Sequence, residues 1–202
     1  MSDAEKPAPT PKDFLLNQAL PRFAAPLADA ERRLAQAQKE IDDIRGAKGA
    51  ICWHVDGMPP VYFNFADGAA SVADDAASEP VMTLRLSAHD WERFATGQVA
   101  GGFLDGGGNR GGFGRSRLDR LKPMKGTVRF SLTGLDSGDW NMDVGLNGPP
   151  ADPPTATLSM PADVAAEIQS GKLNPQMAFM QGRIKMLGDA GLVMQFGMAM
   201  FA

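Results

Sequence analysis

Apolar residues recur every three and four positions between residues 27 and 44, the spacing of one face of an α-helix. This apolar stripe consists of Leu27, Ala30, Leu34, Ala37, Ile41 and Ile44. Charged residues such as Glu31 and Lys39 fall on the other side of that helix. Pro21 and Pro26 precede or adjoin the stripe, and we expect them to break the first part of the helix into short pieces.

Three strand-like runs follow the helix, at residues 50–55, 61–65 and 81–86. Each is rich in β-branched, aromatic or large apolar residues, and Asp-Gly pairs follow the first two as turn signals. Ser87 has Asp90 three residues later, a pattern typical of the N-terminus of a short helix. The order is therefore strand, strand, strand and helix.

The same order returns after a glycine-rich segment. Residues 101–117 contain eight glycines, and ordering so many glycines costs too much entropy for a regular element, so we expect a linker. Beyond it, strand-like runs at 125–132, 140–144 and 157–162 precede another helical stretch and a glycine. This repetition predicts an internal duplication. The alternative is that two generic α+β segments resemble each other by composition.

The second half then continues with a dense motif. Asn174-Pro175 suits the start of a helix that Gly182 ends, and residues 183–187 alternate as a strand. A last short element is expected around Leu192. The motif residues are Gly171, Lys172, Leu173, Asn174, Pro175, Gln176, Ala178, Phe179, Gln181, Gly182, Ile184, Gly188, Gly191, Leu192 and Met194.

This run of residues resembles the hallmark of the sterol carrier protein type two family. The resemblance implies an α+β fold with a mostly antiparallel sheet, helices covering one face, and an apolar tunnel that binds fatty acyl, acyl-CoA, sterol, isoprenoid or phospholipid ligands. It also implies a degenerate, truncated copy with N-terminal helices at 13–100 and a complete lipid-binding domain at 118–202, on either side of the glycine-rich linker at 101–117. Prolines among small and charged residues at 1–12 indicate a disordered arm before them. The residues do not decide whether the two halves share one sheet.

A tunnel for an alkyl chain needs an apolar, adaptable lining, and methionine suits that purpose because it is flexible and polarizable. Methionines are concentrated near the C-terminus of the chain. We therefore expect ligand contacts from Phe130, Trp140, Met142, Met177, Met180, Gln181, Ile184, Met186, Leu192 and Met194. For any one methionine, a place in the ordinary core is the competing interpretation. Gln181 is expected near a ligand headgroup, with a helix-end cap as its alternative.

The composition limits which catalytic and metal-binding functions the chain can have. The 202-residue chain has a formal net charge of −4, one cysteine and two histidines, so it offers few groups for catalysis or metal binding. Cys52 and His54 share a strand face but lack further metal ligands. Nothing pairs a nucleophile with a base, so we expect no enzyme, no cofactor and no metal. The net negative charge of the chain disfavours binding of nucleic acid. Residues 110–115 nevertheless resemble an RGG-type RNA-binding segment.

The sequence thus predicts a cytoplasmic carrier of hydrophobic ligands, since no signal peptide or bilayer-spanning apolar run is visible and no stable membrane insertion is expected. The carrier is expected to be a monomer or homodimer. One alternative is an accessory protein that presents lipid intermediates to a biosynthetic enzyme. Another is a structural pseudo-dimer whose tunnel is filled by side chains.

Overall fold

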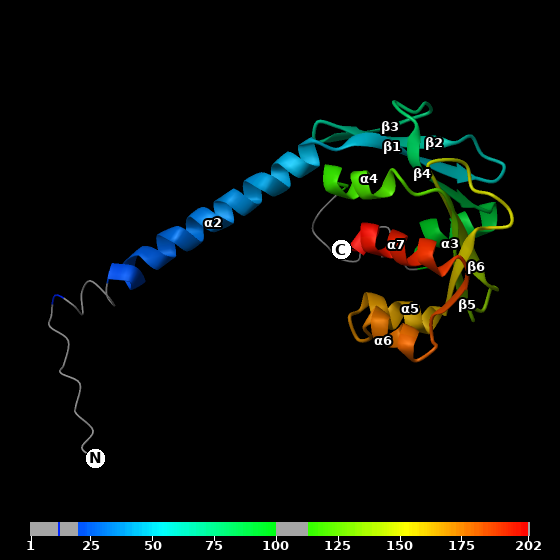
Figure 1. Ribbon diagram of the computed structural model, residues 1–202. Coiled ribbons are helices and arrows are strands. Elements are labelled where there is room, and N and C mark those ends of the chain that lie inside the picture. Colours follow the sequence, from blue (N-terminus) through cyan, green and yellow to red (C-terminus); the bar gives the residue numbers. More distant parts are fainter. Residues whose placement is uncertain (1–11, 13–19, 100–112, 202) are drawn as a thin grey trace, which may run out of the picture. The chain divides into compact units, whose positions relative to one another are not determined.

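In the computed structural model of the protein, Lys12, residues 20–99 and residues 113–201 are described (Figure 1). The chain forms two compact units, residues 1–42 and residues 43–202. The elements are α2 (Leu20–Arg45), β1 (Lys48–Val55), β2 (Val61–Ala66), β3 (Ala69–Ala73), β4 (Pro80–Leu86), α3 (Ala88–Ala95), α4 (Arg115–Leu121), β5 (Gly126–Thr133), β6 (Trp140–Leu146), β7 (Ala156–Pro161), α5 (Ala162–Gln169), α6 (Pro175–Met180), β8 (Lys185–Gly188) and α7 (Ala190–Phe201).

Helix α2 is one uninterrupted helix, so the expectation that prolines divide it was wrong. Pro21 falls in the first turn, where backbone N–H groups have no partner within the helix and proline is tolerated. Pro26 lies inside the helix. An interior proline removes one N–H donor and its ring crowds the carbonyl four residues earlier, but the long run of good helix formers after Pro26 continues the helix. The apolar stripe is therefore carried by a single helix.

The strands form one eight-stranded sheet in the order β3-β2-β1-β4-β6-β5-β7-β8. Neighbouring strands are mostly antiparallel, but β1 runs parallel to β4 and β5 runs parallel to β7. The sheet is therefore mixed. In each half the chain leaves the first strand into an antiparallel neighbour and then returns to the first strand's other side, where it forms the parallel pair.

The two halves of the chain have the same local strand arrangement. In the first half, β1 pairs with β2 on one side and with β4 on the other. In the second half, β5 pairs with β6 on one side and with β7 on the other. The halves meet at β4 and β6, which pair antiparallel from Met82 opposite Leu146 to Arg85 opposite Asp143. The two halves thus share one sheet, which the sequence left open.

Helices α3, α4, α5, α6 and α7 lie on the same side of the sheet (Figure 1). The main core between sheet and helices contains Leu84, Trp140, Met142, Leu118 and Phe196. Val164, Ala178 and Ile184 form a second, smaller cluster. Strands present alternate residues to one face, and Ile51 and Trp53 of β1 and Met82, Leu84 and Leu86 of β4 reach this core in that pattern.

Most elements expected from the sequence are confirmed. Ser87 caps α3 by accepting a hydrogen bond from the Asp90 backbone N–H at 3.0 Å, and Asn174 caps α6 by accepting one from Gln176 N–H at 2.8 Å. Strand β3 was not predicted, and α7 is much longer than the short element expected around Leu192. The arm expected at 1–12, apart from Lys12, and the glycine-rich residues 101–112 lie outside the described residues.

Candidate functional site

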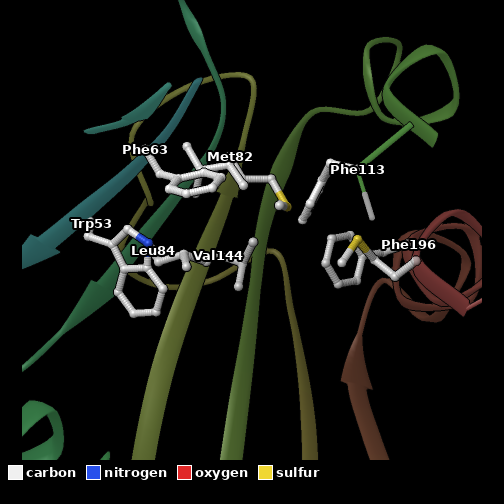
Figure 2. A pocket seen from close by; sticks show the side chains of 9 residues that line it. Trp53, Phe63, Met82, Leu84, Phe113, Val144 and Phe196 are labelled. Carbon is white, nitrogen blue, oxygen red and sulfur yellow. The ribbon is translucent and has the colours of Figure 1, made fainter. Parts of the chain in front are cut away.

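An apolar pocket of about 220 Å³ lies between the sheet and α7. Figure 2 shows side chains from the strands on one side and Phe113 and Phe196 on the other, with Met82 reaching toward the space between them. The pocket is lined by Ile51, Trp53, Phe63, Met82, Leu84, Phe113, Val144, Phe196 and Met200. Every one of these side chains is hydrophobic, so the pocket offers a ligand mainly apolar contact area, and the Trp53 indole N–H is the one polar group that the lining side chains carry.

Strand geometry brings the sheet side of the pocket together. Ile51 and Trp53 are two residues apart on β1, as are Met82 and Leu84 on β4, so each pair points to the same face. Across the sheet, Ile51 is opposite both Phe63 and Met82. Leu84 is opposite Val144 of β6. Contiguous positions on β2, β1, β4 and β6 therefore form one apolar surface.

Helix α7 supplies the opposite side. Phe196 and Met200 are four residues apart and lie on one face of the helix. Both are almost fully buried. Methionines at 82 and 200 give both sides of the pocket a flexible, polarizable side chain that adapts to ligands of different shape.

Aromatic rings fix the ends of the pocket. Trp53 contacts Trp91 and Phe94 of α3, with ring centroids 5.8 Å apart in each case. At the other end, Phe113 lies 6.0 Å from Phe65. These contacts hold the Trp53 and Phe113 rings in place, because offset and edge-on aromatic pairs are favourable at such distances.

One cationic side chain lies behind this lining. The Arg117 guanidinium lies over the Phe113 ring, 5.7 Å from its centroid. Arg117 is mostly buried, and this burial lowers the pKa of its guanidinium. Arginine stays protonated despite such a shift. The lining next to Phe113 is therefore backed by a positive charge.

The residues predicted as ligand contacts lie elsewhere. Trp140, Met142 and Leu192 are buried in the main core, and Phe130 and Met186 pack against it. Ile184 belongs to the second cluster, and Gln181 is the C-cap of α6, as its alternative interpretation had it. The side chains of Met177, Met180 and Met194 are exposed, Met180 to 73% and Met194 to 56%. None of these residues is among those that line the pocket.

Sequence reasoning missed the pocket residues of the first half. Ile51, Trp53, Met82 and Leu84 carry the expected strand alternation, but that signal indicates only a buried face. The pocket depends on β4 pairing with β6 and on α7 packing over both. Neither feature leaves a local pattern in the sequence.

The Cys52 thiol and the Ser87 hydroxyl, two groups that could carry chemistry, are both held in contacts that support the fold. Cys52 is buried on β1, where burial raises the pKa of its thiol, and it lies opposite Tyr62. Ser87 is occupied as the α3 cap, where its hydroxyl also donates to Asp90 Oδ2 at 2.9 Å. Within residues 20–99 and 113–201, no group of His, Cys, Asp and Glu is placed to hold a metal ion. Among the helices described, none is long and apolar enough to cross a bilayer.

Residues 113–200 match the SCP-2 sterol transfer family. Curated relatives include hydroxysteroid dehydrogenase-like protein 2 from Bos taurus and from Homo sapiens, each 36% identical over 83 residues, or 38% of this chain and 20% of the relative. The same protein from Danio rerio is 31% identical over 83 residues, with the same two coverages. The matched part thus spans about a fifth of the length of these relatives.

Solved structures with some similarity include sterol carrier protein 2 like 2 from Aedes aegypti, at 22% identity and a TM-score of 0.31, covering 41% of this chain and 90% of that one. The sterol carrier protein domain 2 of Helicoverpa armigera is 29% identical at a TM-score of 0.29, covering 38% and 67%. The family match includes the pocket residues Phe113, Val144, Phe196 and Met200, whereas the remaining ones precede it.

Proposed function

We propose that the protein binds the hydrocarbon chain of a lipid in the pocket between β1, β2, β4, β6 and α7, and carries or presents that lipid without chemical change. The observation that carries this proposal is a lining made of hydrophobic side chains, held by aromatic contacts and two adaptable methionines. The match of residues 113–200 to the SCP-2 sterol transfer family supports it. Lipid binding would then use both halves of the chain.

The pocket volume favours a narrow chain over a bulky ring system. At about 30 Å³ for a group the size of a water molecule, 220 Å³ holds about seven methylene groups. Burying these gains about 6 kcal/mol at roughly 0.8 kcal/mol per methylene, before the cost of association. The end of a fatty acyl or isoprenoid chain fits this volume, whereas the fused rings of a sterol exceed it unless α7 moves outward.

A matched pair of substitutions on α7 tests the pocket against the site predicted from the sequence. Met200 lines the pocket and Met194 is exposed, so Met200→Trp fills the pocket while Met194→Trp adds bulk at the surface. With cis-parinaric acid as the fluorescent probe, we expect Met200→Trp to weaken binding by about tenfold or more, and Met194→Trp to leave it unchanged. Circular dichroism of both variants checks the fold.

Two results of this binding experiment would contradict the proposed pocket. If Met194→Trp weakens binding and Met200→Trp does not, the ligand lies among the residues predicted from the sequence, such as Met180, Ile184 and Met186. If the unaltered protein gives no fluorescence increase, the pocket is only an imperfection of packing. The structural pseudo-dimer without an open tunnel then becomes the better account.

We propose further that residues 48–97 are a truncated copy of the domain in the second half. Support comes from the equivalent strand arrangements, in which the first strand of each half lies between an antiparallel second strand and a parallel third strand. A helix follows the third strand in both halves, α3 after β4 and α5 after β7. Within the residues that the structure describes, elements corresponding to α6, β8 and α7 follow in the second half alone.

A role in presenting lipid to an enzyme is a second candidate. In the curated relatives, whose name contains hydroxysteroid dehydrogenase, the matched segment is about a fifth of a longer protein. Under this hypothesis, the chain supplies a lipid-binding domain to a biosynthetic enzyme that is a separate protein. Affinity purification from the native cells, with the purified protein's own bilayer-to-bilayer transfer rate measured in parallel, tests this. Rapid unaided transfer without an enzyme partner would contradict it.

A further inference from the structure

The apolar stripe of α2 has the spacing of a coiled coil. Its residues alternate in steps of three and four from Leu27 to Ile44, which is the a and d pattern of a seven-residue repeat. The larger side chains of the stripe are exposed: Leu27 to 65%, Leu34 to 71%, Ile41 to 42% and Ile44 to 39%. A regular row of exposed leucine and isoleucine side chains indicates a surface that binds another apolar surface.

We propose that α2 pairs with α2 of a second copy of this chain as an antiparallel coiled coil. In an antiparallel pair each a position meets a d position of the other helix. Leu34 then meets Ala37, Ala30 meets Ile41, and Leu27 meets Ile44. In four of the six layers a large side chain thus faces alanine, which keeps the layers more even in volume. A parallel pair would stack alanine on alanine at positions 30 and 37, next to layers of leucine on leucine.

The flanking charges select the same register. Arg33 and Glu40 occupy the g positions, which face each other in an antiparallel coiled coil. In the register given above, Arg33 of each copy lies opposite Glu40 of the other, forming two opposite-charge pairs. Sliding one helix by a heptad in one direction places Arg33 opposite Arg33 and Glu31 opposite Glu31, and these like-charge contacts disfavour that register. Sliding in the other direction places Glu40 opposite Glu40 but Glu31 opposite Arg45, and it carries Leu27 and Ala30 past the end of the partner's α2, so that two of the six apolar layers are lost.

The remaining face of α2 is already polar. Arg32 bonds with Asp29, Gln38 Nε2 donates to Asp42 Oδ1 at 2.9 Å, and Gln36 Nε2 donates to Glu40 Oε1 at 3.3 Å. Such pairs at three- and four-residue spacing support the helix in water. The helix is therefore built with one face for water and one for association. The inference does not depend on the proposed ligand, because the pocket is built from residues of β1, β2, β4, β6 and α7 together with Phe113.

The first test is the mass of the full chain in solution, by light scattering after size exclusion at several concentrations. We expect a particle of twice 21.5 kDa. Ala37→Asp puts a charge into the apolar stripe, whereas Ala35→Asp makes the same change on the exposed neighbouring face at the same cost in helix propensity. We expect Ala37→Asp to be monomeric and Ala35→Asp dimeric. A monomeric unaltered chain, or equal behaviour of the two variants, overturns the proposal.

The second test addresses orientation and partner charge. Arg33→Glu and Glu40→Arg each replace two attractive contacts with two repulsive ones, so each should weaken dimerisation by about tenfold or more in low salt. The double variant Arg33→Glu/Glu40→Arg exchanges the charges and should restore the dimer to within about threefold. Failure of the double variant to recover overturns the antiparallel arrangement.

Discussion

At the residue scale, Arg93 is the clearest example of a side chain whose role follows from its surroundings. It is almost fully buried on α3, yet its guanidinium reaches across to the turn before β6. Nη2 donates to the Gly138 carbonyl at 3.0 Å and Nη1 to the Asp139 carbonyl at 3.3 Å. Asp90 Oδ1 lies 3.5 Å from Nη1. Arg93 therefore connects the first half of the chain to the second.

Arg93→Ala is expected to destabilise the protein by about 3 kcal/mol, because it leaves two carbonyl groups and a partly buried carboxylate without their partner. The exposed neighbour Glu92→Ala serves as the control and should change the free energy of unfolding by no more than about 0.5 kcal/mol. Urea unfolding followed by tryptophan fluorescence measures both. Equal, small effects would mean that the Arg93 contacts contribute nothing net.

At the scale of single elements, α4 begins with a cap supplied from the end of α2. Asp43 Oδ1 accepts hydrogen bonds from Ser116 N–H at 2.9 Å and from Ser116 Oγ at 2.6 Å. The Ser116 hydroxyl and then its backbone N–H are the main causes that lower the pKa of the Asp43 carboxyl below its ordinary 3.8. This cap supports a helix whose Leu118 and Leu121 belong to the core.

Asp43→Ala should cost about 1 kcal/mol of stability at pH 7, the usual cost of losing a helix cap. Because the folded-state pKa is lowered, the contribution is present above pH 3.8 and is lost as pH falls through the lower, folded-state pKa. The difference between the unaltered protein and Asp43→Ala should therefore shrink in acid. Thermal unfolding from pH 7 down to pH 2 measures it, with exposed Asp42→Ala as control. A pH-independent difference would contradict the role of the charge.

The sequence predicts elements well where the local signal is strong. Ile51 and Trp53, or Met82 and Leu84, give a clear two-residue alternation, and the Ser87 and Asn174 caps start α3 and α6 as expected. Strand β3 consists of small, mostly exposed residues and carries no such signal. Helix α7 continues through Gln195 and Gly197, which interrupt the apolar run, because burial of Phe196 and Ala199 stabilises it.

The sequence predicted the apolar character of the candidate site but not its location. The methionine-rich motif pointed to an adaptable apolar site, and the pocket has that character. Its location could not be read from the motif, because Met82 and Leu84 reach the pocket only through the pairing of β4 with β6. Contacts between residues so far apart in sequence depend on the whole fold.

At the scale of the whole molecule, the shared sheet predicts that residues 48–86 and 126–146 unfold together. Strands β4 and β6 join the halves through continuous pairing from Met82 opposite Leu146 to Arg85 opposite Asp143. The central strands of both halves should therefore have the same free energy of opening in native-state hydrogen exchange. Earlier exchange of β1 and β4 than of β5 and β6 would show that the halves are independent units.

Native mass spectrometry of the unaltered protein, purified without detergent, tests the binding of a hydrophobic chain most directly. The pocket account predicts a population carrying one noncovalent lipid, identified by extraction as a molecule with an acyl or isoprenoid chain. Met200→Trp prepared from the same cells should lose that population, and Met194→Trp should keep it. A lipid-free unaltered protein that also fails to take up added fatty acid would contradict the account.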